Sequence, residues 1–307
     1  MPGFWLPFGD ARGHVNWRLP DVSKPDIVVL SSFTSITGQR LMRSGLRSRR
    51  WLFWGERLRR NSGIKGSIQR RLTAPISRAS GIVGVGRAAE EDYRRRFPNV
   101  PHFSIPYHCD LSAFFAIPPR PDAYRPVTFF FCGQMIRRKG IDLLLLAFDR
   151  LITNGLESQL LLVGREAELP QFLAKVGPET RSRIRYEGFH APEHLPEYFG
   201  QSDVFVLPSR HDGWGVVINQ ALAAGLPVVA SDEVGAGLDL IEHGINGVRV
   251  AAGDVEALYR AMETLILNPH LAGKWGARSR ERAHDLTPAA GAEKWVRVFE
   301  MFARAAL

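Results

Sequence analysis

The sequence predicts a protein of the α/β class, with parallel sheets in both halves of the chain. Short apolar runs, typical of buried strands, alternate with helical patterns along most of the 307 residues. Such alternation favours parallel, doubly wound sheets. The length suits two domains, and a proline-rich stretch over residues 117–121 lies between the two alternating patterns as a candidate linker.

In the first half, four short apolar runs predict strands and the segments between them predict helices. The strands are expected at residues 27–30, 51–54, 81–85 and 103–106. The helices are expected at residues 36–47, 64–78 and 88–97. The helix over 64–78 carries an apolar residue at every fourth position, opposite a face rich in Arg and Lys. These apolar positions are Ile64, Ile68, Leu72 and Ile76.

After the proline-rich stretch the alternation becomes more regular. Strands are expected at residues 127–131, 159–163, 183–186, 204–207 and 228–230. Helices are expected at residues 141–152, 169–175, 193–200, 216–224, 255–267 and 289–305, the last of them amphipathic. Ligands of such sheets bind beyond the carboxyl ends of the strands, so functional residues are expected in the loops there.

The composition excludes several classes of protein. With 45% hydrophobic and 23% charged residues, the chain is neither disordered nor collagen-like nor a coiled coil. No apolar run approaches the roughly 20 residues that span a bilayer, and the N-terminus does not resemble a signal peptide. Two cysteines are too few for a disulfide scaffold. These features suit a cytoplasmic protein.

Positive charge is concentrated in the first half of the chain. Residues 1–120 hold 20 Lys and Arg against 8 Asp and Glu, whereas the remainder holds 20 against 23. A basic surface over residues 40–78 suits docking on anionic lipid at the inner face of the membrane, each charge contributing about 1 kcal/mol. A merely solvated surface is the alternative. The stretch has no nucleic-acid-binding motif, so no nucleic-acid partner is expected. Its basic residues are Arg40, Arg43, Arg47, Arg49, Arg50, Arg57, Arg59, Arg60, Lys65, Arg70, Arg71 and Arg78.

The loop over residues 131–140 follows a predicted strand and opens a helix. Gly133 allows a close approach to the backbone, and Arg138 and Lys139 bring positive charge. The following helix adds the partial positive charge of its N-terminus, so the loop suits a diphosphate. An ordinary turn with solvated basic residues is the alternative. The spacing excludes a Walker A loop.

The loop over residues 208–216 also joins a strand to a helix. Its glycines let backbone N–H groups converge on an anion, and Asp212 can accept hydrogen bonds from sugar hydroxyls. Gln220 lies a little over two helical turns further on and can point to the same crevice. The alternative is an N-capping Asp before a buried helix. The histidines match no metal-binding motif, so no metal is expected.

Residues 122–288 resemble the C-terminal, donor-binding domain of family-4 retaining glycosyltransferases. Four segments match in the expected order, and the last contains the counterpart of the family's Glu-x7-Glu stretch. They are residues 133–140, 186–189, 202–209 and 212–232. The resemblance implies a GT-B fold, in which two Rossmann-like, doubly wound parallel sheets face each other. It also implies a nucleotide diphosphate sugar as the donor substrate, with no other cofactor.

The resemblance assigns roles to individual residues. Asp212 stands where the first Glu contacts the donor sugar, and Gln220 stands where the second binds the ribose. The backbone amides near the donor sugar and phosphate are those of Gly213, Trp214, Gly215, Val216 and Val217. Lys139 stands where a Lys binds the diphosphate. Gln134 replaces the Arg that follows the loop's glycine, Gly133, so Arg138 is expected to supply that charge. Phe189 lies in the segment that passes the nucleotide base.

The first half resembles the family's acceptor domain incompletely. Residues 25–29 and 105–110 match its segments, but the residues before Pro25 are too few for the strands that normally precede them. We expect an incomplete, acceptor-side Rossmann-like domain over residues 1–121, a donor-binding domain over 122–288 and a C-terminal helix over 289–307 that packs back on the first. Glu56 is closest in position to the family's catalytic His.

These features lead to the hypothesis of a glycosyltransferase that moves a hexosyl group from a nucleotide diphosphate sugar to a hydroxyl acceptor, with retention. The acceptor is expected to be lipid-linked or a saccharide, in cell-surface polysaccharide or glycolipid assembly. Lys139, Arg138 and the helix N-terminus at Gly215 would stabilise the departing diphosphate. The alternative is a non-catalytic remnant that binds a nucleotide sugar or a protein partner.

Overall fold

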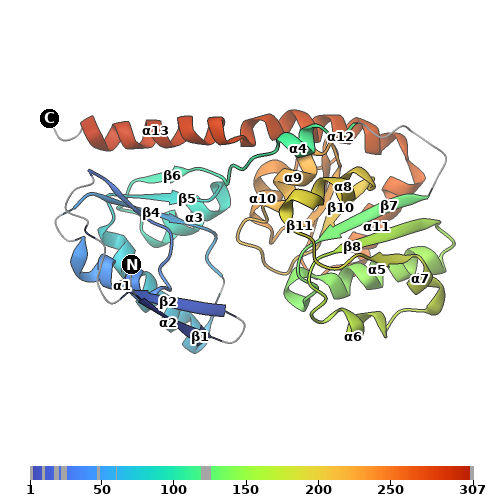
Figure 1. Cartoon of the computed structure of the whole chain (residues 1–307), viewed down its shortest axis with the longest axis horizontal. Coiled ribbons are helices and arrows are strands. Elements are labelled where there is room, and N and C mark those ends of the chain that lie inside the picture. Colours follow the sequence, from blue (N-terminus) through green and yellow to red (C-terminus); the bar gives the residue numbers. More distant parts are fainter. Residues whose placement is uncertain are drawn as a thin grey trace. The chain divides into compact units, whose positions relative to one another are not determined.

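The computed structural model describes residues 3–8, 11–16, 21, 26–46, 49–59, 61–118 and 126–304. The chain forms two compact units (Figure 1). Unit 1 consists of residues 1–106 with 292–307, and unit 2 of residues 107–291. Residues 107–116 precede the proline-rich stretch and yet belong to unit 2. One reason is that Phe114, on α4 (Ser112–Phe115), packs edge-on against Phe199 with ring centroids 5.2 Å apart.

Unit 2 is built on a six-stranded parallel sheet with the order β12-β11-β10-β7-β8-β9. The strands are β7 (Val127–Cys132), β8 (Ser158–Val163), β9 (Ile184–Tyr186), β10 (Val204–Leu207), β11 (Val228–Ser231) and β12 (Gly247–Val250). The chain moves outward from β7 to β9 and then returns to place β10 on the other side of β7. The order therefore reverses between β7 and β10, which is the topological switch point of a doubly wound sheet.

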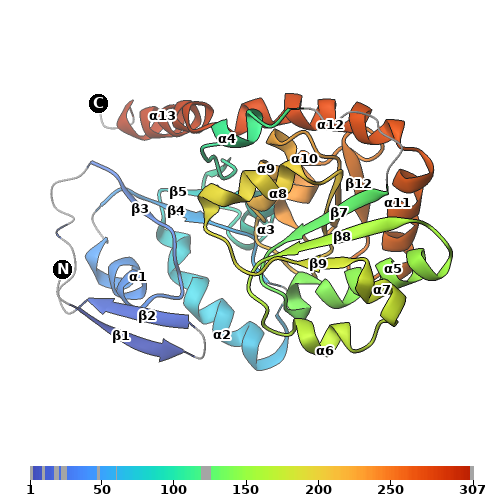
Figure 2. The same cartoon turned by 45° about the vertical axis from the view of Figure 1, so that its right-hand side comes forward.

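Helices cover both faces of this sheet. Helix α5 (Ile141–Thr153) packs with α11 (Val255–Leu267), and α9 (Val217–Ala223) packs with α12 (His270–Ala283). Figure 2 shows these two pairs on opposite sides of the sheet. The runs 129–131 and 160–162 are consequently apolar without alternation, because both faces of these strands are buried. The shorter elements are α6 (Leu169–Leu173), α7 (Pro178–Ser182), α8 (Leu195–Gly200), α10 (Gly235–Leu240), η3 (Arg137–Lys139), η4 (Pro192–His194) and η5 (His284–Leu286).

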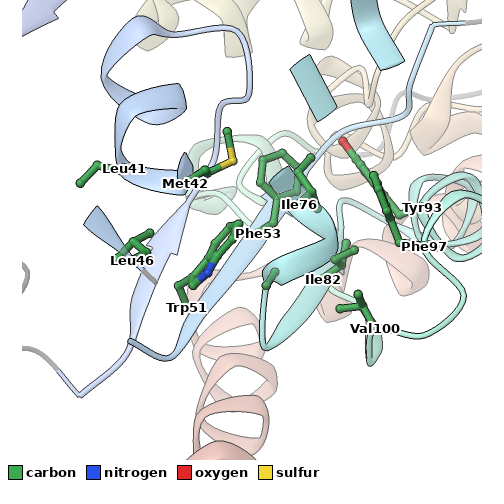
Figure 3. Packing of buried hydrophobic residues seen from close by; sticks show 11 residues of the cluster. Leu41, Met42, Leu46, Trp51, Phe53, Ile76, Ile82, Tyr93, Phe97 and Val100 are labelled. Atoms are coloured by element: carbon green, nitrogen blue, oxygen red, sulfur yellow. The ribbon is translucent and has the colours of Figure 1, made fainter. Parts of the chain in front are cut away.

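Unit 1 contains a four-stranded parallel sheet whose strands follow one another in sequence order. They are β3 (Val28–Leu30), β4 (Trp51–Gly55), β5 (Gly81–Gly84) and β6 (His102–Ser104). Right-handed crossovers between consecutive neighbours place all connecting helices on one face. These connections are α1 (Ile36–Arg40) with the π-helix η1 (Leu41–Gly45), α2 (Gly63–Thr73) with η2 (Ala74–Arg78), and α3 (Arg87–Arg96). Figure 3 shows Met42, Ile76 and Tyr93 from the three connections gathered around Phe53 and Ile82.

The other face of this sheet is covered by α13 (Pro288–Arg304). Val298 packs in a cluster with Leu52 and Val83, which alternate along β4 and β5 with the residues of the first face. The rings of Trp54 and Trp295 meet edge-on with centroids 5.4 Å apart. A helix at the end of the chain thus completes the core of unit 1.

The apolar spacing of residues 64–76 did not predict the buried face correctly. Ile64 is 80% exposed and Ile68 is 55% exposed, whereas Ile76 is fully buried. The buried residues of α2 are Gly66 and Thr73, so Ile64 and Ile68 lie on the opposite side of the helix, and Ile76 belongs to the 3₁₀-helix that follows. Helix α2 therefore presents isoleucines to solvent.

The residues before Pro25 do form strands, but these do not extend the parallel sheet. Among the described residues, β1 (Gly3–Phe8) and β2 (Ala11–Asn16) pair with each other in antiparallel fashion and with no other strand. In the described part of the chain, no helix combines the length and apolar character that crossing a membrane requires.

Candidate functional site

The loops that follow β7 and β10 meet at the switch point of unit 2. Gly140 ends the first loop in the left-handed conformation, with φ of 77°. A Cβ atom there would lie 2.0 Å from the carbonyl oxygen of Pro208, which follows β10, so only glycine permits this approach. The two loops that the sequence marked as functional are therefore in direct contact.

Arg210 fastens one loop to the other. Its backbone N–H donates to the carbonyl oxygen of Arg138 at 2.8 Å, and its Nη1 donates to that of Arg137 at 2.7 Å. Both terminal nitrogens also donate to the carboxylate of Asp142, at 2.6 and 2.8 Å, a planar bidentate pair. In the opposite direction, Nη1 of Arg138 donates to the carbonyl oxygen of His211 at 3.2 Å. These hydrogen bonds hold the two loops against each other.

Lys139 and Asp212 form an ion pair across the two loops. Lys139 Nζ donates to Asp212 Oδ2, and the two side chains are only 18% and 12% exposed. The backbone of Asp212 is held on both sides: its N–H donates to Glu233 O at 2.9 Å and its carbonyl accepts from Gly235 N–H at 3.2 Å. The residues expected to bind the diphosphate and the sugar are therefore partners of each other.

The segment after Asp212 runs directly into α9. Gly213 and Trp214 are buried, and the Trp214 indole N–H donates to Asn219 Oδ1 at 3.1 Å. Gly215 has φ of 87°, and Val216 is 42% exposed. The helix starts at Val217, and the N–H groups of Ile218 and Asn219 in its first turn donate to the carbonyl oxygens of Gly215 and Val216, at 2.9 Å each. Gln220, one turn further along the helix, is half-buried.

The carboxyl ends of β7, β8 and β9 lie along the same edge of the sheet as the two loops. Gly133 N–H donates to Val163 O at 2.9 Å, and Gly164 N–H donates to Gly188 O at 2.7 Å. Phe189 follows and is 62% exposed, and Gln134 is also exposed. The guanidinium of Arg165 lies over the Phe189 ring, 5.3 Å from its centroid.

Sequence reasoning missed Arg165, Arg210 and Asp142. Arg165 and Arg210 each lie within three residues of the end of a predicted strand, and Asp142 lies in the first turn of a predicted helix. Position at the strand ends was therefore the signal available for the two arginines.

Burial shapes the chemistry of Cys132, the last residue of β7. It raises the pKa of the Cys132 thiol to about 12, although the positive charge of Lys139 opposes the shift. The thiol is protonated at neutral pH and is a poor nucleophile.

Glu56 belongs to unit 1. It follows β4 and is exposed. Arg57, counted with the basic surface, is instead almost buried: its side chain is 7% exposed and its Nε lies 3.8 Å from the Asp92 carboxylate. Arg47 and Arg60 lie outside the described residues. Within the described residues, no group of three or more His, Cys, Asp or Glu side chains could hold a metal ion.

Comparison with protein families identifies the part of the chain that carries the site. The family described as "Glycosyl transferases group 1" matches residues 126–268. Both loops lie within this match. Unit 2 is a group 1 glycosyltransferase domain.

Relatives of this glycosyltransferase domain include two from rhizobia. The lipopolysaccharide core biosynthesis mannosyltransferase LpcC of Rhizobium leguminosarum bv. viciae is 31% identical over 223 residues, covering 67% of this chain and 61% of the relative. LpsB of Rhizobium meliloti, with the same description, is 29% identical over 239 residues, covering 72% and 63%. The alpha-D-kanosaminyltransferase of Streptomyces kanamyceticus is 28% identical, with 48% and 38% covered. The chain thus spans less than two thirds of each relative.

Solved structures show the fold of the whole chain. Sucrose-phosphate synthase from Thermosynechococcus elongatus superposes with a TM-score of 0.75 at 22% identity, covering 91% of this chain and 74% of that one. HepE from Anabaena, solved in complex with UDP, gives a TM-score of 0.73 at 18% identity, covering 91% and 79%. The fold is GT-B, which confirms the predicted class.

Proposed function

We propose that the protein is a glycosyltransferase that binds a nucleotide diphosphate sugar at the switch point of unit 2 and transfers a hexosyl group to a hydroxyl acceptor. The observation that carries this proposal is the convergence of Lys139 and Asp212 from two loops beside the αL glycine Gly140. A cation suited to phosphate and a carboxylate suited to sugar hydroxyls lie where doubly wound sheets bind ligands.

Each residue has a role in the proposed complex. Lys139, supported by Arg138, contacts the diphosphate, and the amides of Gly215, Val216 and Val217 face the phosphate and the sugar. Gln220 accepts a hydrogen bond from the ribose, and the exposed Phe189 lies beside the base. No resident metal or cofactor is needed in this arrangement, because the donor is itself a substrate.

We propose that the transfer proceeds with retention. The bond between the anomeric carbon and the diphosphate oxygen breaks, and the acceptor oxygen forms its bond to that carbon on the same face. The acceptor proton passes to the departing phosphate oxygen. Lys139 and Arg138 stabilise the negative charge that develops on the diphosphate, which is the largest electrostatic demand of such a step.

The acceptor in this proposal is a lipid-linked or saccharide hydroxyl in the assembly of cell-surface polysaccharide or glycolipid, at the cytoplasmic face of the membrane. Two of the relatives are described as lipopolysaccharide core mannosyltransferases. Helix α2 also suits contact with lipid: Ile64 and Ile68 are exposed among the exposed cations Lys65, Arg70 and Arg71. Apolar side chains within a basic face are typical of helices that lie in the membrane interface.

A second candidate function is binding of a nucleotide sugar without turnover. It is favoured by the replacement of both family Glu residues, by Asp212 and Gln220, and by a four-stranded sheet in unit 1 against six strands in unit 2. The two functions differ in one result: only the enzyme releases nucleoside diphosphate when a nucleotide sugar and a membrane extract are supplied together.

Calorimetric titration of the full chain with UDP and GDP tests the donor site. We expect one of them to bind, and Lys139→Ala to weaken that binding by about 1.5–3 kcal/mol, the range of a hydrogen bond to a charged group. Lys274→Ala, which removes an exposed lysine of α12, should leave it unchanged. Binding of neither nucleotide nor of their sugar conjugates would contradict the proposal, and so would equal effects of the two substitutions.

Sedimentation with vesicles tests the membrane contact. The full chain should co-sediment with vesicles of phosphatidylglycerol and phosphatidylcholine, and less with phosphatidylcholine alone. Ile64→Ser with Ile68→Ser should reduce the bound fraction, whereas Leu267→Ser, at a residue 62% exposed in unit 2, should not. Equal loss in both variants, or no binding to anionic vesicles, would remove α2 from the proposal.

A further inference from the structure

We infer that the Lys139–Asp212 ion pair makes the site distinguish a loaded donor from its spent nucleotide. This inference rests on the proposed function. A nucleoside diphosphate takes Lys139 away from Asp212 and leaves the carboxylate without its cation. A nucleotide sugar takes the same lysine but supplies a hydroxyl that donates to the carboxylate. The pair thus couples recognition of the diphosphate to recognition of the sugar.

The Lys139–Asp212 pair is largely buried. The Asp212 side chain is 12% exposed, and Lys139 Nζ donates to its Oδ2. A carboxylate with so little access to water is strongly destabilised when its partner leaves, because the lost interaction is not replaced by solvation. Removing the ammonium from Asp212 therefore opposes binding of any ligand that requires that ammonium.

Of the two residues in the ion pair, Lys139 is the one whose charged group can move. The Asp212 backbone is fixed on both sides by hydrogen bonds to Glu233 and Gly235, at 2.9 and 3.2 Å. Its side chain has a single methylene group, so the carboxylate stays close to that backbone. Lysine carries its ammonium on a flexible four-carbon stem. The ammonium consequently leaves for the phosphate while the carboxylate stays in place.

A hydroxyl group of the donor sugar can replace Lys139 as the partner of Asp212. An ionised carboxylate only accepts hydrogen bonds, so its new partner must be a donor. The sugar of a nucleotide sugar brings hydroxyl donors next to the diphosphate, whereas a free nucleoside diphosphate brings none there. After transfer the sugar has gone, and Asp212 recaptures Lys139, which favours release of the spent nucleotide.

Calorimetry on the full chain tests the exchange with the nucleotide, UDP or GDP, that binds the wild type, and with its glucose and mannose conjugates. Asp212→Asn removes the charge that competes for Lys139 and keeps the size of the side chain. We expect this variant to bind the nucleoside diphosphate about tenfold more tightly. The preference for the better sugar conjugate over the diphosphate should fall by a similar factor. Asp285→Asn, at a side chain 74% exposed, controls for the loss of one negative charge. It should change neither the affinity for the diphosphate nor the preference for the sugar conjugate.

Thermal unfolding without ligand gives an independent measurement. Lys139→Ala leaves the buried Asp212 carboxylate without its cation and should lower Tm. Adding Asp212→Asn to this variant should restore part of the lost Tm. Weaker or unchanged diphosphate binding by Asp212→Asn would overturn the exchange. Such a result is expected if Lys139 contacts the diphosphate and the Asp212 carboxylate at the same time, because the substitution then removes a group that holds the lysine in place. A wild type that binds neither nucleotide nor conjugate would refute the proposed function itself, and the inference with it.

Discussion

In unit 2 the chain reverses its direction across the sheet between β7 and β10, whereas in unit 1 strands β3 to β6 are neighbours in sequence order. The reversal sends the helices that follow β7 and β10 to opposite faces of the sheet, and the loops before them meet at the edge where doubly wound sheets bind ligands. Gly140, Arg210 and the Lys139–Asp212 pair all lie there. Unit 1 has no such reversal among its described strands.

The same difference explains how each unit is covered. The connecting helices of unit 2 lie on both faces of its sheet, so these helices alone bury both faces (Figure 2). In unit 1 the connections share one face, and the other is covered by α13 through Val298, Trp295 and Phe302. Strand order therefore determines both where a ligand can bind and which element is needed to complete the core.

The largest effect is expected in the reactivity of Cys132, at the end of β7 beneath the first loop. With a pKa of about 12, its thiolate at pH 8.5 should be on the order of a thousandfold scarcer than that of an ordinary thiol, whose pKa is about 8.5. Because burial raises the pKa, alkylation should accelerate as the pH rises towards 12. Mass spectrometry after iodoacetamide treatment at pH 8.5 measures this, with urea-unfolded protein as the reference. If Cys132 is labelled as fast in the folded protein as in the unfolded protein, its thiol at the end of β7 is accessible to solvent and not buried.

A pair of glycines measures the contact between the two loops. Gly140→Ala places a methyl group against Pro208 O in a left-handed backbone and should destabilise unit 2 by about 2–5 kcal/mol. Gly155 also has a positive φ, 75°, but nothing lies within 4 Å of its Cβ position. Gly155→Ala should therefore cost only the backbone term, about 1–2 kcal/mol. Urea unfolding of both variants gives the difference, and equal losses would show that the loops do not press together at Gly140.

A pair of valines on α13 measures how far that helix stabilises unit 1. Val298 is 4% exposed in the cluster with Leu52 and Val83, whereas Val296 is 52% exposed. Val298→Ala should destabilise unit 1 by about 1–2 kcal/mol, and Val296→Ala by less than about 0.5 kcal/mol. The gain in helix propensity is the same in both and cancels. Hydrogen exchange of β4 and β5 reports the local stability, and similar protection in the two variants would contradict the packing of α13 on this face.

The parts of the fold that could be predicted are those with a clear local pattern. Both loops of the site follow short apolar strands and precede helices, so the sequence alone was enough to single out Lys139 and Asp212. Their pairing could not be predicted, because Lys139 and Asp212 are 73 positions apart and meet only because β7 and β10 are neighbours in the sheet. Ile64 and Ile68 misled the prediction because their spacing of four residues is typical of a buried helix face, whereas α2 buries Gly66 and Thr73. Helix α12 and strand β12 were missed, since neither combines length with a sustained apolar period.

Hydrogen exchange with and without UDP or GDP tests most directly whether the nucleotide binds at the switch point of unit 2. The binding nucleotide should slow exchange of the amides in residues 133–141 and 213–218, around Lys139 and the start of α9. The segments after β3, β4 and β5 in unit 1, at residues 31–35, 56–59 and 85–87, should exchange at the same rates with and without nucleotide. Protection confined to those unit 1 segments would contradict binding at the switch point, and so would unchanged exchange in both loops at saturating nucleotide.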